Sequence, residues 1–142
     1  MIRQAKSSDL KQIVKILRTE YKKTFKETWS EKSAMKIIRG YFHTVSIFVH
    51  LHEKTITGFI ITRPVTWNDG LRYIVEEIAV SSDYQGKGIG RELIEHVEKF
   101  ARKKGAVKIE LFAGKKSKAF KIYKKFGFKE STDYVHMYKK LK

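Results

Sequence analysis

The sequence predicts an α+β (mixed α/β) domain in which helices flank a central, mostly antiparallel twisted sheet. Three observations lead to this class. Segments with alternating apolar residues and segments with apolar residues at helical spacing follow one another along the chain. Hydrophobic residues make up 42% of the 142 residues, which is enough for a core. One proline, no linker and no internal repeat favour a single domain over residues 1–142.

The N-terminal part is expected to form a short strand, at 1–5, followed by two helices. Ser7, Ser8 and Asp9 can start the first helix, and Ser30 can cap the second. The apolar residues at helical spacing are Leu10, Ile13, Val14, Leu17, Tyr21 and Phe25 in the first helix and Ala34, Ile37, Ile38, Tyr41 and Phe42 in the second.

Three strands are expected next, separated by two tight turns. The turn signals are the segments 53–55 and 68–70, and the second of them reads Asn-Asp-Gly. The strands are expected at 45–52, 56–63 and 71–80. The last strand is unusual because it contains two adjacent carboxylates, Glu76 and Glu77.

The second half of the chain continues the alternation. A loop at 81–90 leads into a helix from about 89 to 104, which Gly105 ends. A strand at 107–113 follows, and then a helix that Ser117 caps and that runs to about Phe126. Two closing strands are expected at 128–130 and 134–141.

The composition excludes several classes of protein. The chain has no cysteine, so disulfide scaffolds, cysteine nucleophiles and thiolate zinc sites are excluded. The five histidines show no metal-ligand spacing, and we expect no metal. No apolar run could span a bilayer and no signal peptide is evident, so we expect a cytoplasmic protein that does not enter the membrane.

The chain is strongly basic, with 31 Lys and Arg against 15 Asp and Glu, a net charge of +16. The excess lies in the flanks: residues 1–55 carry +7 and residues 99–142 carry +12, whereas residues 56–98 carry −3. Such a surface favours polyanionic partners. A lysine-rich surface that serves only solubility or heat stability explains the same numbers, so both interpretations stay open.

The segment 78–91 is the most informative one for chemistry. Glycines at 86, 88 and 90, flanked by Lys87 and Arg91, lie between a strand and a helix. Backbone N–H groups and a helix N-terminus make such a loop an anion cradle, which suits a phosphate or pyrophosphate. The pattern fits neither a Walker A loop nor the dinucleotide-binding fingerprint, whose third glycine would come one position later.

Two motifs resemble the GNAT superfamily of N-acetyltransferases. Residues 85–90, Gln-Gly-Lys-Gly-Ile-Gly, resemble its Gln/Arg-x-x-Gly-x-Gly/Ala signature, and residues 77–84 are similar to the segment that precedes it. Residues 119–128 resemble its Ala-x-x-x-Tyr-x-x-x-Gly-Phe helix and strand, and the start of the chain, at 2–10, is similar to that of many members. The resemblance covers essentially the whole chain and implies a GNAT-like acyl-CoA N-acyltransferase fold.

The resemblance implies acetyl-CoA as the cosubstrate. It places the pantetheine arm beside the strand, the pyrophosphate at the loop, and a proton donor for the CoA thiolate at Tyr123. Lys116 stands where many members have Asn, so either this Lys or Ser117 is expected to fill that role. The implied cofactor-binding residues are Ile78, Ala79, Val80, Gln85, Gly86, Lys87, Gly88, Ile89, Gly90, Arg91, Lys116, Ser117, Ala119 and Tyr123.

Direct acetyl transfer to an amine needs a base, because most amines are protonated at neutral pH. Glu76 and Glu77 are the candidates, and Glu110 on the neighbouring strand is a third. Successive strand residues face opposite sides, so only one of the pair is expected to reach the amine site, and we favour Glu77. Backbone N–H groups near Val80 are the expected donors to the thioester oxyanion.

The sequence predicts an acetyl-CoA-dependent N-acetyltransferase that acts on a primary amine. The amine could belong to a protein N-terminus, a lysine side chain or a small molecule. Two alternatives remain: a basic nucleic-acid-binding protein that uses residues 118–142, and a catalytically silent acyl-CoA-binding module. The chain could be a monomer or a homodimer that pairs through its C-terminal strands.

Overall fold

Five strands form one sheet in the order β1-β2-β3-β4-β5. The first four pair antiparallel, and β5 pairs parallel to β4, which confirms the mostly antiparallel sheet. This computed structural model describes residues 1–142, which form two units, 1–112 and 113–142, and the first unit holds the whole sheet. The strands are β1 (Ile2–Gln4), β2 (Ser46–His52), β3 (Thr55–Trp67), β4 (Gly70–Val80) and β5 (Lys108–Leu111).

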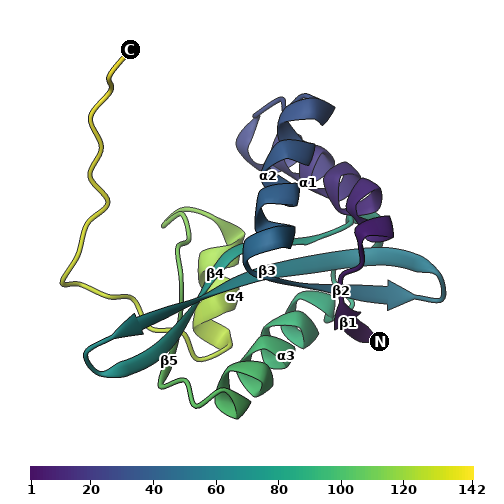
Figure 1. Ribbon diagram of the computed structural model, residues 1–142. Helices are drawn as coiled ribbons and strands as arrows, with labels where there is room; N and C mark the ends of the chain where they lie inside the picture. Colours follow the sequence, from purple (N-terminus) through teal and green to yellow (C-terminus); the bar gives the residue numbers. More distant parts are fainter. The chain divides into compact units, whose positions relative to one another are not determined.

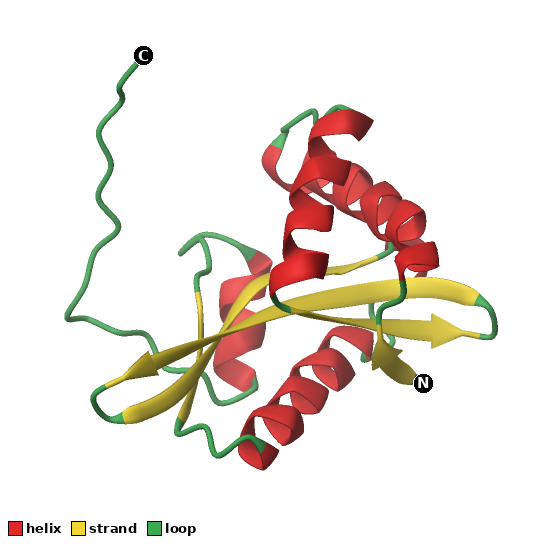
Figure 2. Cartoon of the chain, in the orientation of Figure 1, coloured by secondary structure: helices red, strands yellow, loops and turns green.

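Helices cover both faces of the sheet in the first unit. The first two, α1 (Leu10–Phe25) and α2 (Glu31–Thr44), lie on one face, and α3 (Ile89–Lys103) lies on the other (Figures 1 and 2). Short 3-10 turns, Ser7–Asp9 and Ser82–Tyr84, precede α1 and α3. The largest cluster of buried apolar residues lies between the sheet and α1 and α2, and it includes Ile13, Leu17, Ile38, Phe59 and Ile61.

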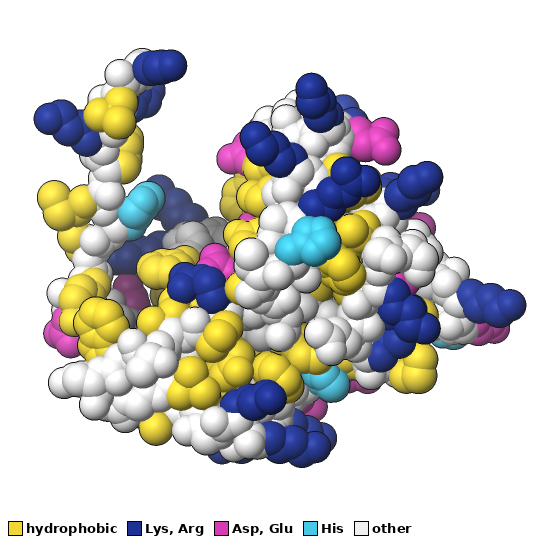
Figure 3. All heavy atoms as spheres, in the orientation of Figure 1, with side chains coloured by type: hydrophobic (Ala, Val, Ile, Leu, Met, Phe, Trp, Pro, Cys, Tyr) yellow, Lys and Arg dark blue, Asp and Glu magenta, His cyan; other side chains and the backbone are white.

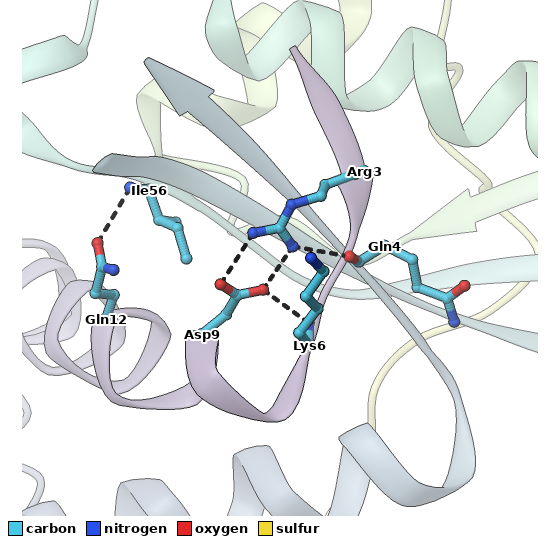
Figure 4. A network of polar contacts seen from close by, with 6 residues as sticks. All are labelled: Arg3, Gln4, Lys6, Asp9, Gln12 and Ile56. Atoms are coloured by element: carbon cyan, nitrogen blue, oxygen red, sulfur yellow. Dashed lines mark hydrogen bonds and ion pairs between the residues drawn. The ribbon is translucent and has the colours of Figure 1, made fainter. Parts of the chain in front are cut away.

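A charged network fixes the start of α1 against β1 (Figure 4). The two terminal nitrogens of the Arg3 guanidinium donate to the Asp9 carboxylate, at 2.7 and 3.1 Å, and the backbone N–H of Lys6 donates to the same carboxylate at 2.7 Å. The Arg3 hydrogen bonds hold the pKa of Asp9 below its ordinary value. Asp9 thus anchors the chain before α1 rather than capping that helix. The predicted cap of α2 is confirmed, because the Ser33 N–H donates to Ser30 Oγ at 3.0 Å.

Two β-bulges interrupt the register of the central strand β3. His50 pairs with Gly58 and Leu51 with Ile56, so Thr57 is an extra residue on β3. On the other side of β3, Ile61 pairs with Glu77 and Thr62 with Val75, so Glu76 is an extra residue on β4. A bulge shifts every later residue of its strand by one position relative to the neighbour, which changes the face that each side chain occupies.

Strand β3 is longer than predicted and continues through Pro64 to Trp67. The pairing of β2 with β3 ends at Thr62, so beyond that point β3 pairs only with β4. Pro64 therefore has one neighbouring strand, opposite Tyr73, and a proline without an N–H is tolerated at such an edge position.

The two predicted closing strands, at 128–130 and 134–141, are wrong. The second unit contains one regular element, the helix α4 (Lys118–Lys125), and no strand. A strand needs a neighbour for its backbone groups, and alternation of apolar and polar residues does not supply one. The apolar side chains of this segment are exposed, among them Tyr134, Val135, Met137, Tyr138 and Leu141.

Candidate functional site

The loop between β4 and α3 has the left-handed backbone that its glycines predict. Gly86 has φ +77° and Gly88 has φ +85°, values that other residues rarely adopt. Gly88 is the N-cap of α3, and the N–H of Glu92 donates to its carbonyl at 3.0 Å. Residues 86–88 are exposed, whereas Ile89 is buried and fixes the first turn of α3 against the sheet.

Five consecutive backbone N–H groups, from Gly86 to Gly90, donate to no acceptor in the protein. They lie at the N-terminus of a helix of 15 residues, where the peptide dipoles add partial positive charge. The Lys87 ammonium lies 5.3 Å from the centre of the Tyr84 ring, and the Arg91 guanidinium donates to Glu95 at 3.0 Å. The loop therefore combines unsatisfied donors with two cations, which is the chemistry of an anion-binding site.

Side chains of α1 hold this loop in place. The Gln85 amide donates to Glu20 Oε1 and to the carbonyl of Val80, both at 2.8 Å. Ser82 donates to the other oxygen of Glu20 at 2.8 Å. Both of these hydrogen bonds from the Gln85 amide, a predicted cofactor-binding group, thus fix the loop. Contact between Gln85 and a cofactor remains a prediction.

The edge of β4 that leads to this loop has no strand beside it. Strand β5 pairs with residues Arg72 to Val75 of β4, and β4 continues to Val80. From Glu76 onward, β4 is paired through one edge only, with β3. The backbone polar groups on the other edge, next to Ile78 and Val80, are available to an extended ligand.

The bulge at Glu76 brings both adjacent glutamates to the side of the sheet that α1 and α2 cover. Glu77 accepts a hydrogen bond from Tyr21 of α1 at 2.5 Å, and Glu76 accepts one from Arg63 of β3 at 2.5 Å. Both carboxylates raise the pKa of Tyr41 of α2, after burial, which is the largest cause. The extra residue interrupts the alternation from which we expected only one glutamate at the amine site, and which of the two reaches an amine remains a prediction.

The two carboxylates differ in their surroundings. Burial raises the pKa of Glu77, and the negative charges of Glu76 and Glu27 add to this, whereas the hydrogen bond from Tyr21 acts in the opposite direction. Burial and the contact with Glu77 also raise the pKa of Tyr21 well above its ordinary value, so the phenol stays protonated and donates. Glu76 instead forms an ion pair with Arg63. Glu77 is therefore the carboxylate whose affinity for protons is increased.

The remaining predicted site residues lie in the second unit. Ser117 caps α4, because its hydroxyl accepts from the Phe120 N–H at 3.2 Å and donates to the Gly114 carbonyl at 2.7 Å. Lys116 is exposed, and Ala119 lies in the first turn of α4. The half-buried Tyr123 has its ring 5.8 Å from that of Phe128, and its carbonyl accepts from the Phe128 N–H.

Glu110, the third candidate base, lies on β5 and forms ion pairs with two neighbouring cations. Arg72 donates to its carboxylate at 2.8 Å, and the Lys108 ammonium lies 3.7 Å away. The Glu110 carboxylate is thus held by two cations of β4 and β5, and its part in catalysis remains a prediction.

A family model described as the acetyltransferase (GNAT) family matches residues 10–128. The chain belongs to this family. The matched range includes both glutamates, the glycine loop and α4, so every predicted site residue falls within the acetyltransferase match.

Two curated proteins are related to parts of this chain. An uncharacterized N-acetyltransferase of Methanocaldococcus jannaschii is 40% identical over 57 residues, which cover 39% of this chain and 25% of that protein. The streptothricin acetyltransferase of Streptomyces lavendulae is 35% identical over 77 residues, which cover 54% of this chain and 40% of that protein. The chain thus matches less than half the length of either relative.

Solved structures establish the fold. A possible acetyltransferase from Clostridium difficile 630 superposes with a TM-score of 0.89 at 18% sequence identity, over 100% of this chain and 98% of that one. The expected α+β class with a GNAT-like arrangement is therefore confirmed.

Several residues around this candidate site carry no signal in the sequence. Tyr21, Tyr41 and Arg63 reach the glutamates from α1, α2 and β3, and only the packing of these elements brings them together. His50 is another case: its buried ring contacts Thr57 at 2.7 Å and Glu92 of α3 at 2.9 Å, which ties the start of α3 to the sheet. The described chain contains no cluster of metal-ligating side chains and no helix long and apolar enough to cross a membrane.

Proposed function

We propose that this protein is an N-acetyltransferase that transfers the acetyl group of acetyl-CoA directly to a primary amine. The observation that carries the proposal is the row of five unbonded N–H groups at the start of α3, next to an unpaired edge of β4. Together they offer a site for a pyrophosphate and, beside it, for an extended amide-containing arm. Acetyl-CoA contains both parts.

On this proposal the loop holds the cofactor through its backbone. The N–H groups from Gly86 to Gly90 donate to the pyrophosphate, and Lys87 and Arg91 add charge. The backbone of residues 78–80 pairs with the pantetheine arm. Lys116, Ser117, Ala119 and Tyr123 remain the contacts that the family resemblance assigns to the second unit. Because the Ser117 hydroxyl already caps α4, Lys116 is the better candidate for a polar contact there.

The proposed chemistry uses Glu77 as the base. The raised pKa of Glu77 improves its match to an ammonium group, from which it takes a proton directly or through a water. The amine nitrogen then attacks the thioester carbonyl carbon, and backbone N–H groups near Val80 stabilise the oxyanion. The C–S bond breaks as the C–N bond is completed. The CoA thiolate takes a proton from Tyr123, and the amine nitrogen loses its second proton to solvent.

The acceptor belongs to one of three classes of primary amine: a protein N-terminus, a lysine side chain or a small molecule. Aromatic and acidic side chains lie beside the proposed base, including Tyr21, Trp29 and Glu27, and this combination attracts a cationic amine. A partial relative acts on streptothricin, which supports testing small-molecule acceptors first.

Calorimetric titration tests the cofactor site. We expect saturable binding of acetyl-CoA that persists at high salt, with ATP binding more weakly at both salt concentrations. The expected stabilisation at a hundredfold excess over the dissociation constant is about 2.7 kcal/mol, measured as a rise in unfolding temperature. Equal binding of ATP and acetyl-CoA that vanishes with salt would identify the loop as a general cationic patch and would contradict the proposal.

Release of free CoA in a screen of primary amines tests the catalytic part. With an accepted amine, Glu77→Gln is expected to lower kcat by about 100-fold or more while acetyl-CoA binding is retained. Lys54→Gln, on the β2–β3 turn, is the matched control and is expected to keep full activity. Binding of acetyl-CoA without turnover of any amine would instead support the silent acyl-CoA-binding module.

A further inference from the structure

Four cations form a narrow stripe along the exposed side of α1. Lys11, Lys15, Arg18 and Lys22 are spaced by four, three and four residues, which places them on one face of the helix. All four are exposed. At 1.5 Å per residue the stripe is about 16 Å long. The hydrogen bonds between α1 and the segment that precedes the glycines involve Glu20 and Lys23, and the proposed acetyl transfer uses none of the four stripe residues.

None of the four cations has a carboxylate within ion-pair distance. The exposed arginines of α3 behave differently, because Arg91 pairs with Glu95 and Arg102 with Glu98. Like charges three or four residues apart cost a helix about 0.2–0.5 kcal/mol per pair. The stripe therefore concentrates uncompensated positive charge on one helix, which favours a polyanionic partner.

The stripe borders a groove that also contains an aromatic ring. The groove has a volume of about 470 Å³, and besides residues of α1 it is lined by Thr28, Trp29 and one carboxylate, Glu31, against the four cations. The Trp29 ring stacks on Tyr21 with 5.8 Å between centroids, and its backbone carbonyl accepts from Arg18 at 2.8 Å. These contacts hold a half-buried indole in a fixed orientation beside the cations. Figure 3 shows Lys and Arg side chains over the layer formed by α1 and α2.

We propose that this groove binds single-stranded nucleic acid, with the stripe on the phosphates and Trp29 against a base. A positive groove that tracks the backbone, combined with an aromatic ring for stacking, is the common design of sequence-tolerant single-strand binding. The length of the stripe corresponds to about five nucleotides at 3.4 Å each. An acidic peptide would use the cations but offers a planar group to the indole only where it contains an aromatic residue, whereas every nucleotide carries one, so the observations favour nucleic acid. This binding shares Trp29 with the surroundings of the proposed acceptor amine but uses none of the other groups of the proposed acetyl transfer, so the charge-reversal variants below test it separately.

The test uses the full chain and an oligothymidylate of 12 nucleotides with a fluorescent label. Anisotropy is recorded between 50 and 300 mM NaCl. Contact of four cations with phosphates predicts a slope of log affinity against log salt of about −2.8. The chain has two tryptophans, so Trp67→Phe leaves Trp29 as the only indole, and the oligonucleotide is expected to quench its fluorescence.

Charge reversal locates the binding site. The triple variant Lys11→Glu, Lys15→Glu, Lys22→Glu is expected to bind at least about tenfold more weakly and to lose about two units of salt slope. The matched control reverses three exposed lysines outside α1, through Lys54→Glu, Lys99→Glu and Lys103→Glu, and is expected to stay within about twofold of the parent. Circular dichroism confirms that both variants are folded. Trp29→Ala is expected to weaken binding without changing the slope.

Three results would overturn the proposal. Equal loss of affinity in the two triple variants would show diffuse attraction by the net charge. Binding without any change in Trp29 fluorescence would show that no nucleobase stacks on Trp29. Polyglutamate that binds as tightly as the oligonucleotide would identify an acidic polypeptide as the better partner. Loss of acetyl-CoA binding has no bearing on these readouts, so this proposal and the proposed function fail separately.

Discussion

Two neighbours act in opposite directions on the Glu77 carboxyl. The hydrogen bond from Tyr21 lowers its pKa, and the negative charge of Glu76 raises it. Tyr21→Phe is therefore expected to move the pKa of Glu77 upward, and Glu76→Gln is expected to move it downward. A base must be ionised, so the acidic limb of the kcat/KM profile should shift to higher pH in the first variant and to lower pH in the second.

The measurement is kcat/KM for acetyl transfer between pH 5 and 9, together with a carbon-13 titration of the Glu77 carboxyl by NMR. Tyr41→Phe is the control for loss of a phenol near the carboxylates, because Tyr41 forms no hydrogen bond with Glu77. Glu77 is not the base if the acidic limb moves in the same direction in the Tyr21→Phe and Glu76→Gln variants. The same conclusion follows if the NMR titration shifts but the activity profile does not.

The pair Glu76 and Glu77 illustrates how much of the candidate site can be predicted from the sequence. Glu77 is preferred over Glu76 from the sequence, and its raised pKa supports that choice. Strict alternation along the strand, however, does not hold at these two residues, because Glu76 is an extra residue in a bulge. The bulge arises from the register between β3 and β4, and that register depends on long-range pairing that no local pattern of residues records.

At the scale of elements, the glycine loop depends on backbone geometry more than on space. A side chain at Gly88 would meet no atom within 4 Å, but its φ of +85° is unfavourable for any other residue. Gly88→Ala is expected to cost about 1–2 kcal/mol, either as lost stability or as a rearranged loop. Titration calorimetry should then show acetyl-CoA binding weakened by about 5–30-fold.

Gly40→Ala is the matched control, because Gly40 lies inside α2 with free space around it. Alanine there is expected to stabilise the protein by about 0.5–1 kcal/mol and to leave acetyl-CoA binding unchanged. Equal binding by the Gly88→Ala variant and the parent would show that the left-handed conformation at this position is not needed for the cofactor.

Elements marked by local signals are predicted well from this sequence. The Ser30 cap, the glycine loop and the start of α3 follow from short-range chemistry, and the structure has all three. The end of β3 and the closing strands depend on which neighbours are present. Strand β3 continues through Pro64 because β2 no longer pairs with it there, so the missing N–H of proline costs no hydrogen bond to β2. The alternating residues at 134–141 form no strand because no neighbouring strand pairs with their backbone groups.

At the scale of the whole molecule, the net charge of +16 sets a dependence of stability on salt. Repulsion among the excess cations destabilises the folded state, and salt screens it as the Debye length falls from about 30 Å at 0.01 M to about 8 Å at 0.15 M. We expect the unfolding temperature to rise by about 3–6 °C over that range. Differential scanning calorimetry with NaCl measures this.

The variant with three α1 lysines reversed to glutamate carries a net charge lower by six, so its unfolding temperature should depend less on salt. The same reduction is expected for the control at positions 54, 99 and 103, since the effect follows total charge rather than one surface. A constant or falling unfolding temperature in the parent would show that local ion pairs outweigh the excess charge.

The unpaired edge of β4 has a consequence for handling the protein. A row of free backbone groups on a strand is a template for pairing with another chain, and such edges promote aggregation. An extended ligand bound along residues 77–80 would cover that template, so it would act as a stabiliser against self-association as well as a substrate. Light scattering during storage should therefore rise more slowly with acetyl-CoA present than without it, even where no acceptor is ever added.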